Sequence, residues 1–177
     1  MPDLPDTIRK PLETCSYSST YSYIFGLERK ITPEYLVATF IPGHERSILT
    51  AIFETAGGPM RTAPEGAGLM YCFTAGWHDG ELGELSEGER RRRVIREVQK
   101  YWPEFPDEPL FTECIRYDRA INLESPGQFP AIHHLMRHHY RDVKGLYLAG
   151  EYLFLIACTE GAFSTGEQAA RMVLEDL

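Results

Sequence analysis

Several features that mark other protein classes are missing from this sequence of 177 residues. Its apolar runs are far shorter than the roughly 20 residues of a membrane-spanning helix. Its four cysteines (Cys15, Cys72, Cys114 and Cys158) form no C-x-x-C pair, which favours reduced thiols over a zinc site or a disulfide framework. The first ten residues hold two prolines and four charges instead of an apolar signal peptide. We therefore expect a cytoplasmic protein.

An excess of positive charge is also missing. The net charge is -8, so a broad surface for nucleic acid is excluded, because nothing offsets the repulsion of phosphate. The one basic run, Arg90 to Arg93, lies inside a helical pattern, and we interpret it as a solvated helix face.

What is present indicates an α+β fold. The length suits one compact unit, and strand patterns dominate the first part while helices dominate the rest. We expect a mixed or antiparallel sheet with flanking helices, after an extended lead-in from Pro2 to Pro11. The expected strands are 14–27, 36–41, 48–54, 68–75 and 110–121. The expected helices begin at Ser86, with Glu89 completing a capping box, and at Pro130.

The C-terminal stretch from Gly145 to Leu177 carries the most chemical information. It predicts a short strand (146–149), a turn at Ala149-Gly150-Glu151, and a helix that begins at Thr159-Glu160-Gly161-Ala162. A helix N-terminus presents free N–H groups and suits an anion or a ring oxygen that gains negative charge. Small residues (Ala162, Gly166, Ala169 and Val173) fall on one helix face and would admit a flat ligand or another backbone. Closure of a core by the same strand, turn and helix is equally compatible with these patterns.

The order and spacing of two motifs favour a ligand-binding role of this stretch over closure of a core. GLYLAGE (Gly145 to Glu151) and EGAFSTGEQAA (Glu160 to Ala170) resemble the C-terminal flavin-binding signature of FAD-dependent amine oxidases, protoporphyrinogen oxidases and phytoene desaturases. The resemblance implies that Gly150 and Glu151 lie by the ribityl–pyrophosphate of FAD. It also implies that the backbone of Glu160, Gly161 and Ala162 meets the pyrimidine edge of the flavin.

The resemblance further implies a domain organisation. Residues 1–143 would be similar to the substrate domain, and residues 144–177 would supply a strand, turn and helix that complete a Rossmann-like FAD domain. The family's G-x-G-x-x-G unit, which grips the pyrophosphate, has no counterpart here. We therefore expect that the chain is the C-terminal portion of a flavoenzyme and that a separate FAD-binding N-terminal half is its partner. The chain alone should bind FAD weakly or not at all, and it should form a homo-oligomer through uncovered surfaces.

Chemistry is expected to be hydride transfer from an apolar amine, porphyrinogen or polyene-like substrate to the flavin. No catalytic residue stands out. The alternative is a non-catalytic module, or partner subunit, that acts through protein–protein contacts. The aromatic residues Tyr17, Tyr21, Tyr23, Tyr71 and Phe73 could line a substrate pocket or form ordinary sheet core. His134 and His138, at i and i+4, could chelate zinc, but we expect a structural or surface role and no metal site.

Overall fold

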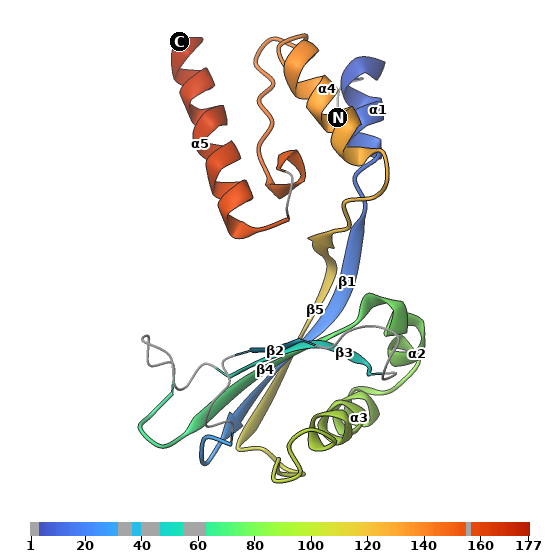
Figure 1. Cartoon of the computed structure of the whole chain (residues 1–177), viewed down its shortest axis with the longest axis vertical. Coiled ribbons are helices and arrows are strands. Elements are labelled where there is room, and N and C mark those ends of the chain that lie inside the picture. The colour runs from blue at the N-terminus through green and yellow to red at the C-terminus, as the bar shows by residue number, and fades with distance from the viewer. Residues whose placement is uncertain (1–3, 32–36, 40–46, 55–62, 155–156) are drawn as a thin grey trace. The chain divides into compact units, whose positions relative to one another are not determined.

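The computed structural model describes residues 4–31, 37–39, 47–54, 63–154 and 157–177 (Figure 1). The strands are β1 (Tyr17–Leu27), β2 (Val37–Thr39), β3 (Leu49–Glu54), β4 (Gly68–Thr74) and β5 (Phe111–Asn122). The helices are α1 (Asp6–Glu13), α2 (Asp79–Gly83), α3 (Glu87–Gln99), α4 (Gln128–His138) and α5 (Thr159–Glu175), with 3-10 turns η1 (Gly76–His78) and η2 (Glu151–Leu153). The predicted α+β class is confirmed.

The chain forms two compact units. Unit 1 comprises Met1–Ser18 and Arg119–Leu177, and unit 2 comprises Ser19–Asp118. These units do not coincide with the predicted domains, residues 1–143 and residues 144–177. The predicted boundaries describe the domains of the family, and they stay a prediction.

One sheet, in the order β2-β3-β4-β1-β5, organises unit 2. β1 pairs with β4, β4 with β3, and β3 with β2, all antiparallel. Helix α3 covers one face of the sheet (Figure 1), and alternate residues of β1 and β4 pack beneath it. The fully buried members of this core include Tyr23, Phe25, Met70, Val94 and Val98.

The sequence explains where α3 begins. The Ser86 side chain accepts from the Glu89 amide at 3.4 Å, and the Glu89 carboxylate accepts from the Ser86 amide at 3.0 Å, so the predicted capping box is confirmed. The interpretation of the basic run as a solvated face is wrong for Arg90. Its guanidinium lies 4.2 Å from the centre of the Tyr21 ring and donates to the Leu82 carbonyl.

In unit 1, a smaller apolar cluster joins α1 to α4, with Ile8, Ile132 and Leu135 buried at its centre. The expected extended lead-in is wrong here, because residues 6–13 form helix α1. Leu4, Ile8 and Leu12 recur every four residues, so one helix face can pack on α4, and this burial outweighs the cost of Pro11 inside the helix.

The expected strand at 146–149 is also wrong: these residues have no regular secondary structure. A strand needs a neighbour with which to exchange backbone hydrogen bonds, and the described residues place none beside this segment. Leu146 and Leu148 instead pack into the unit 1 cluster.

Candidate functional site

The turn at Gly150 and the first turn of α5 are tied together by Thr165. The buried Thr165 hydroxyl accepts from the Gly150 amide at 3.0 Å and lies 2.8 Å from the Gly161 carbonyl, to which it can donate. Two of the motifs expected to hold a ligand are thus neighbours within unit 1. Sequence reasoning missed Thr165, although its spacing of four from Gly161 places both residues on one helix face.

Gly150 is required by its backbone conformation. Its φ of 140° lies in a region that side chains strongly disfavour. A Cβ at this position would also lie 2.7 Å from the Tyr152 ring. The turn is therefore fixed from two sides, by the conformation of Gly150 and by the hydroxyl of Thr165. Burial raises the pKa of Tyr152 to about 12, so this ring is neutral at physiological pH.

The N-terminus of α5 has backbone amides without an acceptor inside the helix. The Gly161 amide is bound by the Cys158 sulfur at 3.4 Å, whereas the amides of Thr159 and Glu160 have no acceptor within the helix. Glu160 and Ala162 are exposed. Gly161 is buried, and a Cβ there would lie 2.7 Å from the Cβ of Phe154, so its small size accommodates a protein side chain. An anionic group can therefore approach at Glu160 but not over Gly161.

Two carboxylates connect the segment after β5 to these motifs. Glu151 accepts from the Asn122 amide at 3.3 Å, and Glu124 accepts from the Ala157 amide at 2.6 Å. Glu124 has a φ of 50°, which is unusual for a residue other than glycine. The segment from Asn122, the last residue of β5, to Gly127, which we call the β5–α4 loop, thus belongs to the site although the sequence did not indicate it.

This loop buries polar groups without partners. Both polar atoms of the Asn122 carboxamide are buried and have no hydrogen-bond partner in the part of the chain that the structure describes. The Oε1 atom of Gln128, the first residue of α4, is also buried and without a partner in this part of the chain. An unpaired buried polar group costs about 1–3 kcal/mol, so these side chains are unusual in a segment that serves packing alone.

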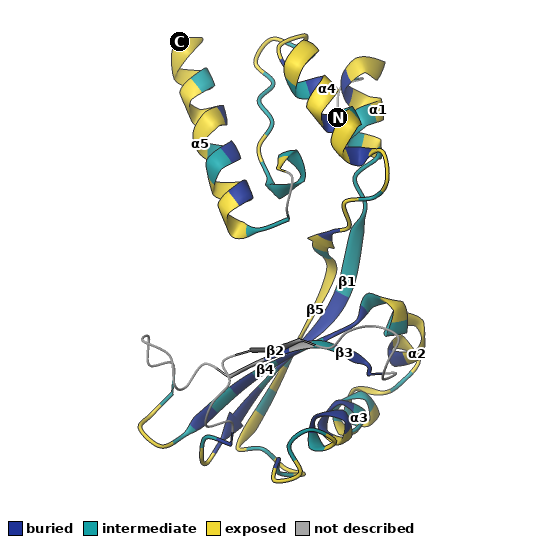
Figure 2. Ribbon diagram, viewed as in Figure 1, coloured by how far each residue is buried: buried dark blue, intermediate teal, exposed yellow. Residues whose placement is uncertain are grey.

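The predicted small face of α5 is divided in the structure. Its buried stripe is Gly161, Thr165 and Ala169, while Ala162 is exposed and Val173 is partly exposed. Apart from its chain neighbours and the backbone of the helix itself, no atom of the described residues lies within 4 Å of a Cβ placed at Gly166. Figure 2 shows the outward side of α5 as exposed, and Phe163 and Leu174 on this helix are 77% and 72% exposed.

The aromatic residues on the sheet separate into two groups. Tyr23 is fully buried under α3, and the Tyr21 ring lies between the guanidinium groups of Arg90 and Arg116, so a pocket lined by these two tyrosines is wrong. Tyr71 pairs with Ile24, which alternates with Tyr23, so Tyr71 lies on the opposite face. That face, where Phe111 and Tyr117 are 48% and 45% exposed, is the one open to a ligand.

The histidines of α4 lie near one another. The ring centres of His134 and His138 are 4.7 Å apart, and His139 Nδ1 lies 2.8 Å from an Asp142 carboxylate oxygen. Within the described ranges, no group of three or more His, Cys, Asp or Glu side chains is arranged to hold a metal ion. Nor does any described helix have the length and apolar character needed to cross a membrane.

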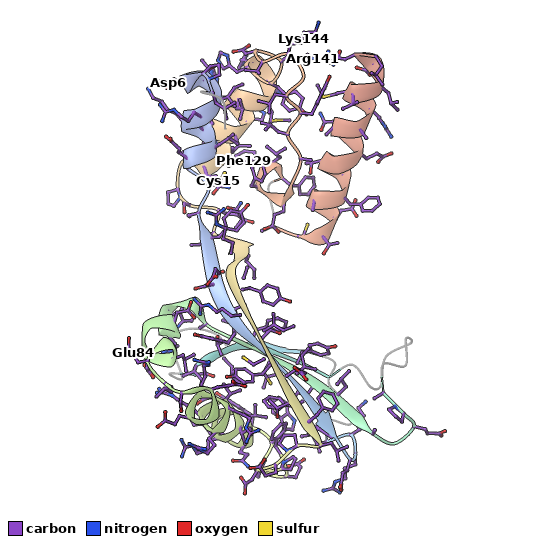
Figure 3. The ribbon with its side chains drawn as sticks, turned by 180° about the vertical axis from the view of Figure 1, so that it is seen from behind. Asp6, Cys15, Glu84, Phe129, Arg141 and Lys144 are labelled. Carbon is purple, nitrogen blue, oxygen red and sulfur yellow. The ribbon has the colours of Figure 1, made fainter. Side chains whose placement is uncertain are left out.

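Helix α5 is also fixed at its far end. Arg141 binds Glu175 and Asp176, each at 3.2 Å, and Figure 3 shows Arg141 near the C-terminal end of the helix. Tyr147 donates to Asp176 at 2.7 Å. The segment that leads to Gly150 therefore contacts α5 near both of its ends.

The sequence matches the family model for flavin-containing amine oxidoreductases over residues 1–174. The chain belongs to this family. No curated protein matches the sequence.

Solved structures agree at the level of the fold. A provisionally assigned protoporphyrinogen oxidase from Exiguobacterium sp. 255-15 superposes with a TM-score of 0.67 at 16% identity, covering 93% of this chain and 37% of that one. Putrescine oxidase, in a structure bound to putrescine, gives a TM-score of 0.67 at 14% identity, covering 98% and 39%. The chain thus spans less than two fifths of the length of the structures it matches.

Proposed function

We propose that this chain supplies the C-terminal part of the FAD site, and a substrate-binding sheet, of a flavin-dependent oxidoreductase. The observation that carries the proposal is the contact between the Gly150 turn and the first turn of α5 through Thr165, in a chain of the flavin-containing amine oxidoreductase family. The geometry supports the positions that the sequence resemblance implies for Gly150 and Glu160.

The residues fit the cofactor chemically. The free amides at the start of α5 suit the pyrimidine edge of the flavin, which gains negative charge on reduction. The unpaired Asn122 carboxamide, whose backbone amide is bound by Glu151, adds an unused donor and acceptor beside the turn. Bound FAD would accept a hydride from the substrate. The protein groups would hold and orient the ring and stabilise its charge.

The open sheet face of unit 2 is the proposed substrate surface. Tyr71, Ile115 and Tyr117 present partly exposed apolar groups there, opposite the face that α3 covers. An amine with an apolar body, a porphyrinogen or a polyene-like molecule has the matching chemistry. Removal of these side chains should raise KM more than it lowers kcat, because they bind the substrate without taking part in hydride transfer.

A glycine-rich dinucleotide-binding half is the proposed partner, either in the same polypeptide or in a separate one. The exposed side of α5, with Phe163 and Leu174, supports a contact with another protein surface. The chain by itself should self-associate through the same uncovered groups. Light scattering at micromolar concentration should then show a dimer or larger assembly, and a monodisperse monomer would contradict this part of the proposal.

The direct test is flavin retention. The purified chain is soaked with FAD and passed over gel filtration, with and without a polypeptide that contains G-x-G-x-x-G and co-purifies with it. We expect stoichiometric flavin absorbance, and turnover of an amine or porphyrinogen, only in the mixture. Stoichiometric flavin retained by the chain alone would contradict the incomplete site, and turnover absent from a flavin-loaded mixture would favour a non-catalytic module.

A further inference from the structure

The side chain of Asn122 stands apart from the other buried polar groups. It is 3% exposed, and within the described part of the chain both Nδ2 and Oδ1 lack a hydrogen-bond partner. Every other described side chain with an unpaired buried polar atom has only one such atom. Residues on either side, Ile121 and Leu123, are more than half exposed. The carboxamide therefore points inward from the end of β5 and brings an unused donor and an unused acceptor with it.

The surroundings of Asn122 connect it to the proposed cofactor site. Its backbone amide donates to Glu151, the residue after Gly150, and Gly150 is bound through Thr165 to Gly161. These contacts form an unbroken path from the end of β5 to the first turn of α5. The carboxamide is thus held within the same group of residues that is proposed to surround the flavin.

The chemistry of the side chain selects one part of a ligand. A carboxamide that offers one donor beside one acceptor is complementary to a ring N–H flanked by a carbonyl, because both hydrogen bonds can then form in one plane. The pyrimidine portion of the isoalloxazine ring has this pattern. Neither the pyrophosphate nor the ribityl chain of FAD offers it. Adenine sets an amino donor beside a ring-nitrogen acceptor, with which a carboxamide can also pair, so ADP, which contains adenine but no flavin, separates the two rings in the test below.

Burial does not prevent such a contact. No hydrogen bond holds the carboxamide in its present orientation, so rotation about its side-chain torsions breaks none. An unpaired buried amide is also costly, which favours any movement that gives it a partner. An isosteric apolar residue would avoid that cost, so the presence of asparagine needs another reason.

We infer that the Asn122 carboxamide pairs with the pyrimidine ring of the flavin and fixes its orientation. This inference rests on the proposed function. Asn122 is a binding and positioning residue, and the β5–α4 loop becomes a third element of the cofactor site beside the Gly150 turn and the N-terminus of α5.

The test is an NMR titration of the ¹⁵N-labelled full chain, which detects binding too weak for gel filtration. On addition of FAD we expect shifts of the backbone amides of Gly150, Glu151 and Glu160, and of the Asn122 side-chain amide. ADP carries a pyrophosphate but no flavin ring, and it should leave the Asn122 side-chain signal unchanged.

Two substitutions complete the test. Asn122→Leu should keep or raise the unfolding midpoint, because an apolar side chain replaces an unpaired polar one, and should weaken FAD binding about tenfold through the loss of two hydrogen bonds. Gln128→Leu is the matched control: it removes another buried carboxamide, at the first residue of α4 and outside the β5–α4 loop, and should leave FAD binding unchanged. If Asn122→Leu lowers the unfolding midpoint, FAD binding is measured with Asn122→Ala in its place.

The outcomes separate the two proposals. Shifts at Gly150, Glu151 and Glu160 without any effect at Asn122, or equal FAD affinity of the wild type and the Asn122 variant, would overturn the inference and leave the proposed function standing. The absence of shifts at all of these residues at millimolar FAD, both for the chain alone and for its mixture with the polypeptide that contains G-x-G-x-x-G, would overturn both.

Discussion

The two units differ in how their unpaired buried polar atoms are distributed. In unit 2 five described side chains have one such atom each, and the sheet pairs in antiparallel ladders beneath α3. In unit 1 both polar atoms of the Asn122 carboxamide lack a partner among the described residues, Glu124 has a positive φ, and Phe163 is 77% exposed.

The difference indicates what each unit is built for. In unit 2, Asp79 and Glu97 each have one unpaired buried atom but keep an ion pair through the other carboxylate oxygen, whereas the buried Tyr23 hydroxyl is unpaired among the described residues. Conformational strain and unpaired polar groups persist where function requires them. The turn, loop and helix start of unit 1 therefore match a site that a ligand and another protein surface complete.

The largest expected effect separates the two faces of the sheet in unit 2. Phe25→Ala removes a fully buried ring under α3 and should lower the free energy of unfolding by about 3–5 kcal/mol. Tyr71→Ala, on the open face, should cost less than half as much because the ring is only partly buried. Denaturant unfolding measures both, and equal losses would contradict the assignment of an open face.

A smaller effect is expected at the joint within unit 1. Thr165→Val keeps the shape of the side chain but leaves the Gly150 amide without its acceptor, which should cost about 1–3 kcal/mol. Ser164→Ala is the control, because Ser164 is less buried and bonds only to the Glu160 side chain, so its loss should change the free energy of unfolding little. If thermal unfolding does not distinguish the two variants, Thr165 does not hold the turn to the helix.

The strain at Glu124 can be measured by comparing two variants. Glu124→Ala and Glu124→Gly both remove the carboxylate that binds the Ala157 amide, but only glycine accepts a φ of 50° without cost. Glu124→Gly should therefore be more stable than Glu124→Ala by about 1 kcal/mol. At most positions with negative φ the order is reversed, so the sign of the difference tests the backbone conformation itself.

The last effect is confined to alkaline pH and is absent at neutral pH. Burial raises the pKa of Tyr152 to about 12, above the value of 10.0 expected for an unperturbed tyrosine. The folded state therefore holds the hydroxyl proton of Tyr152 more tightly than the unfolded state does. Above pH 10 the unfolded state loses this proton first, so the stability that neutral Tyr152 contributes below pH 10 is lost as the pH rises toward 12. Tyr152→Phe should make unfolding less dependent on pH in this window. An unchanged slope would show that Tyr152 ionises alike in both states.

Regular patterning explains which parts of the fold could be predicted. β1, β3, β4, β5 and α3 show alternation or a capping box, and the structure places each within a few residues of its expected bounds. Helix α1 was missed because Pro5 and Pro11 indicate an extended chain, whereas burial of Ile8 against α4 decides the conformation. Segment 146–149 has a strand's composition but no strand beside it in the described residues.

The site was predictable where motifs carry it. Gly150 and Gly161 stand in the motifs that resemble the family signature, and the structure brings their turns together. Thr165, Asn122 and Glu124 were not identified, because their roles depend on contacts between residues 15 or more positions apart or on a backbone angle. Tyr21 and Tyr23 were ambiguous, since alternation alone does not tell which face of a sheet a helix covers.

The most direct test of the central claim is to map where FAD perturbs the backbone amides of the ¹⁵N-labelled chain. We expect weak binding with shifts concentrated at Gly150, Glu151, Glu160, Gly161 and Ala162, and little change among the buried residues of β1 and β4. Shifts confined to the sheet, or none at these five residues at millimolar FAD even with the polypeptide that contains G-x-G-x-x-G present, would contradict a flavin site in unit 1.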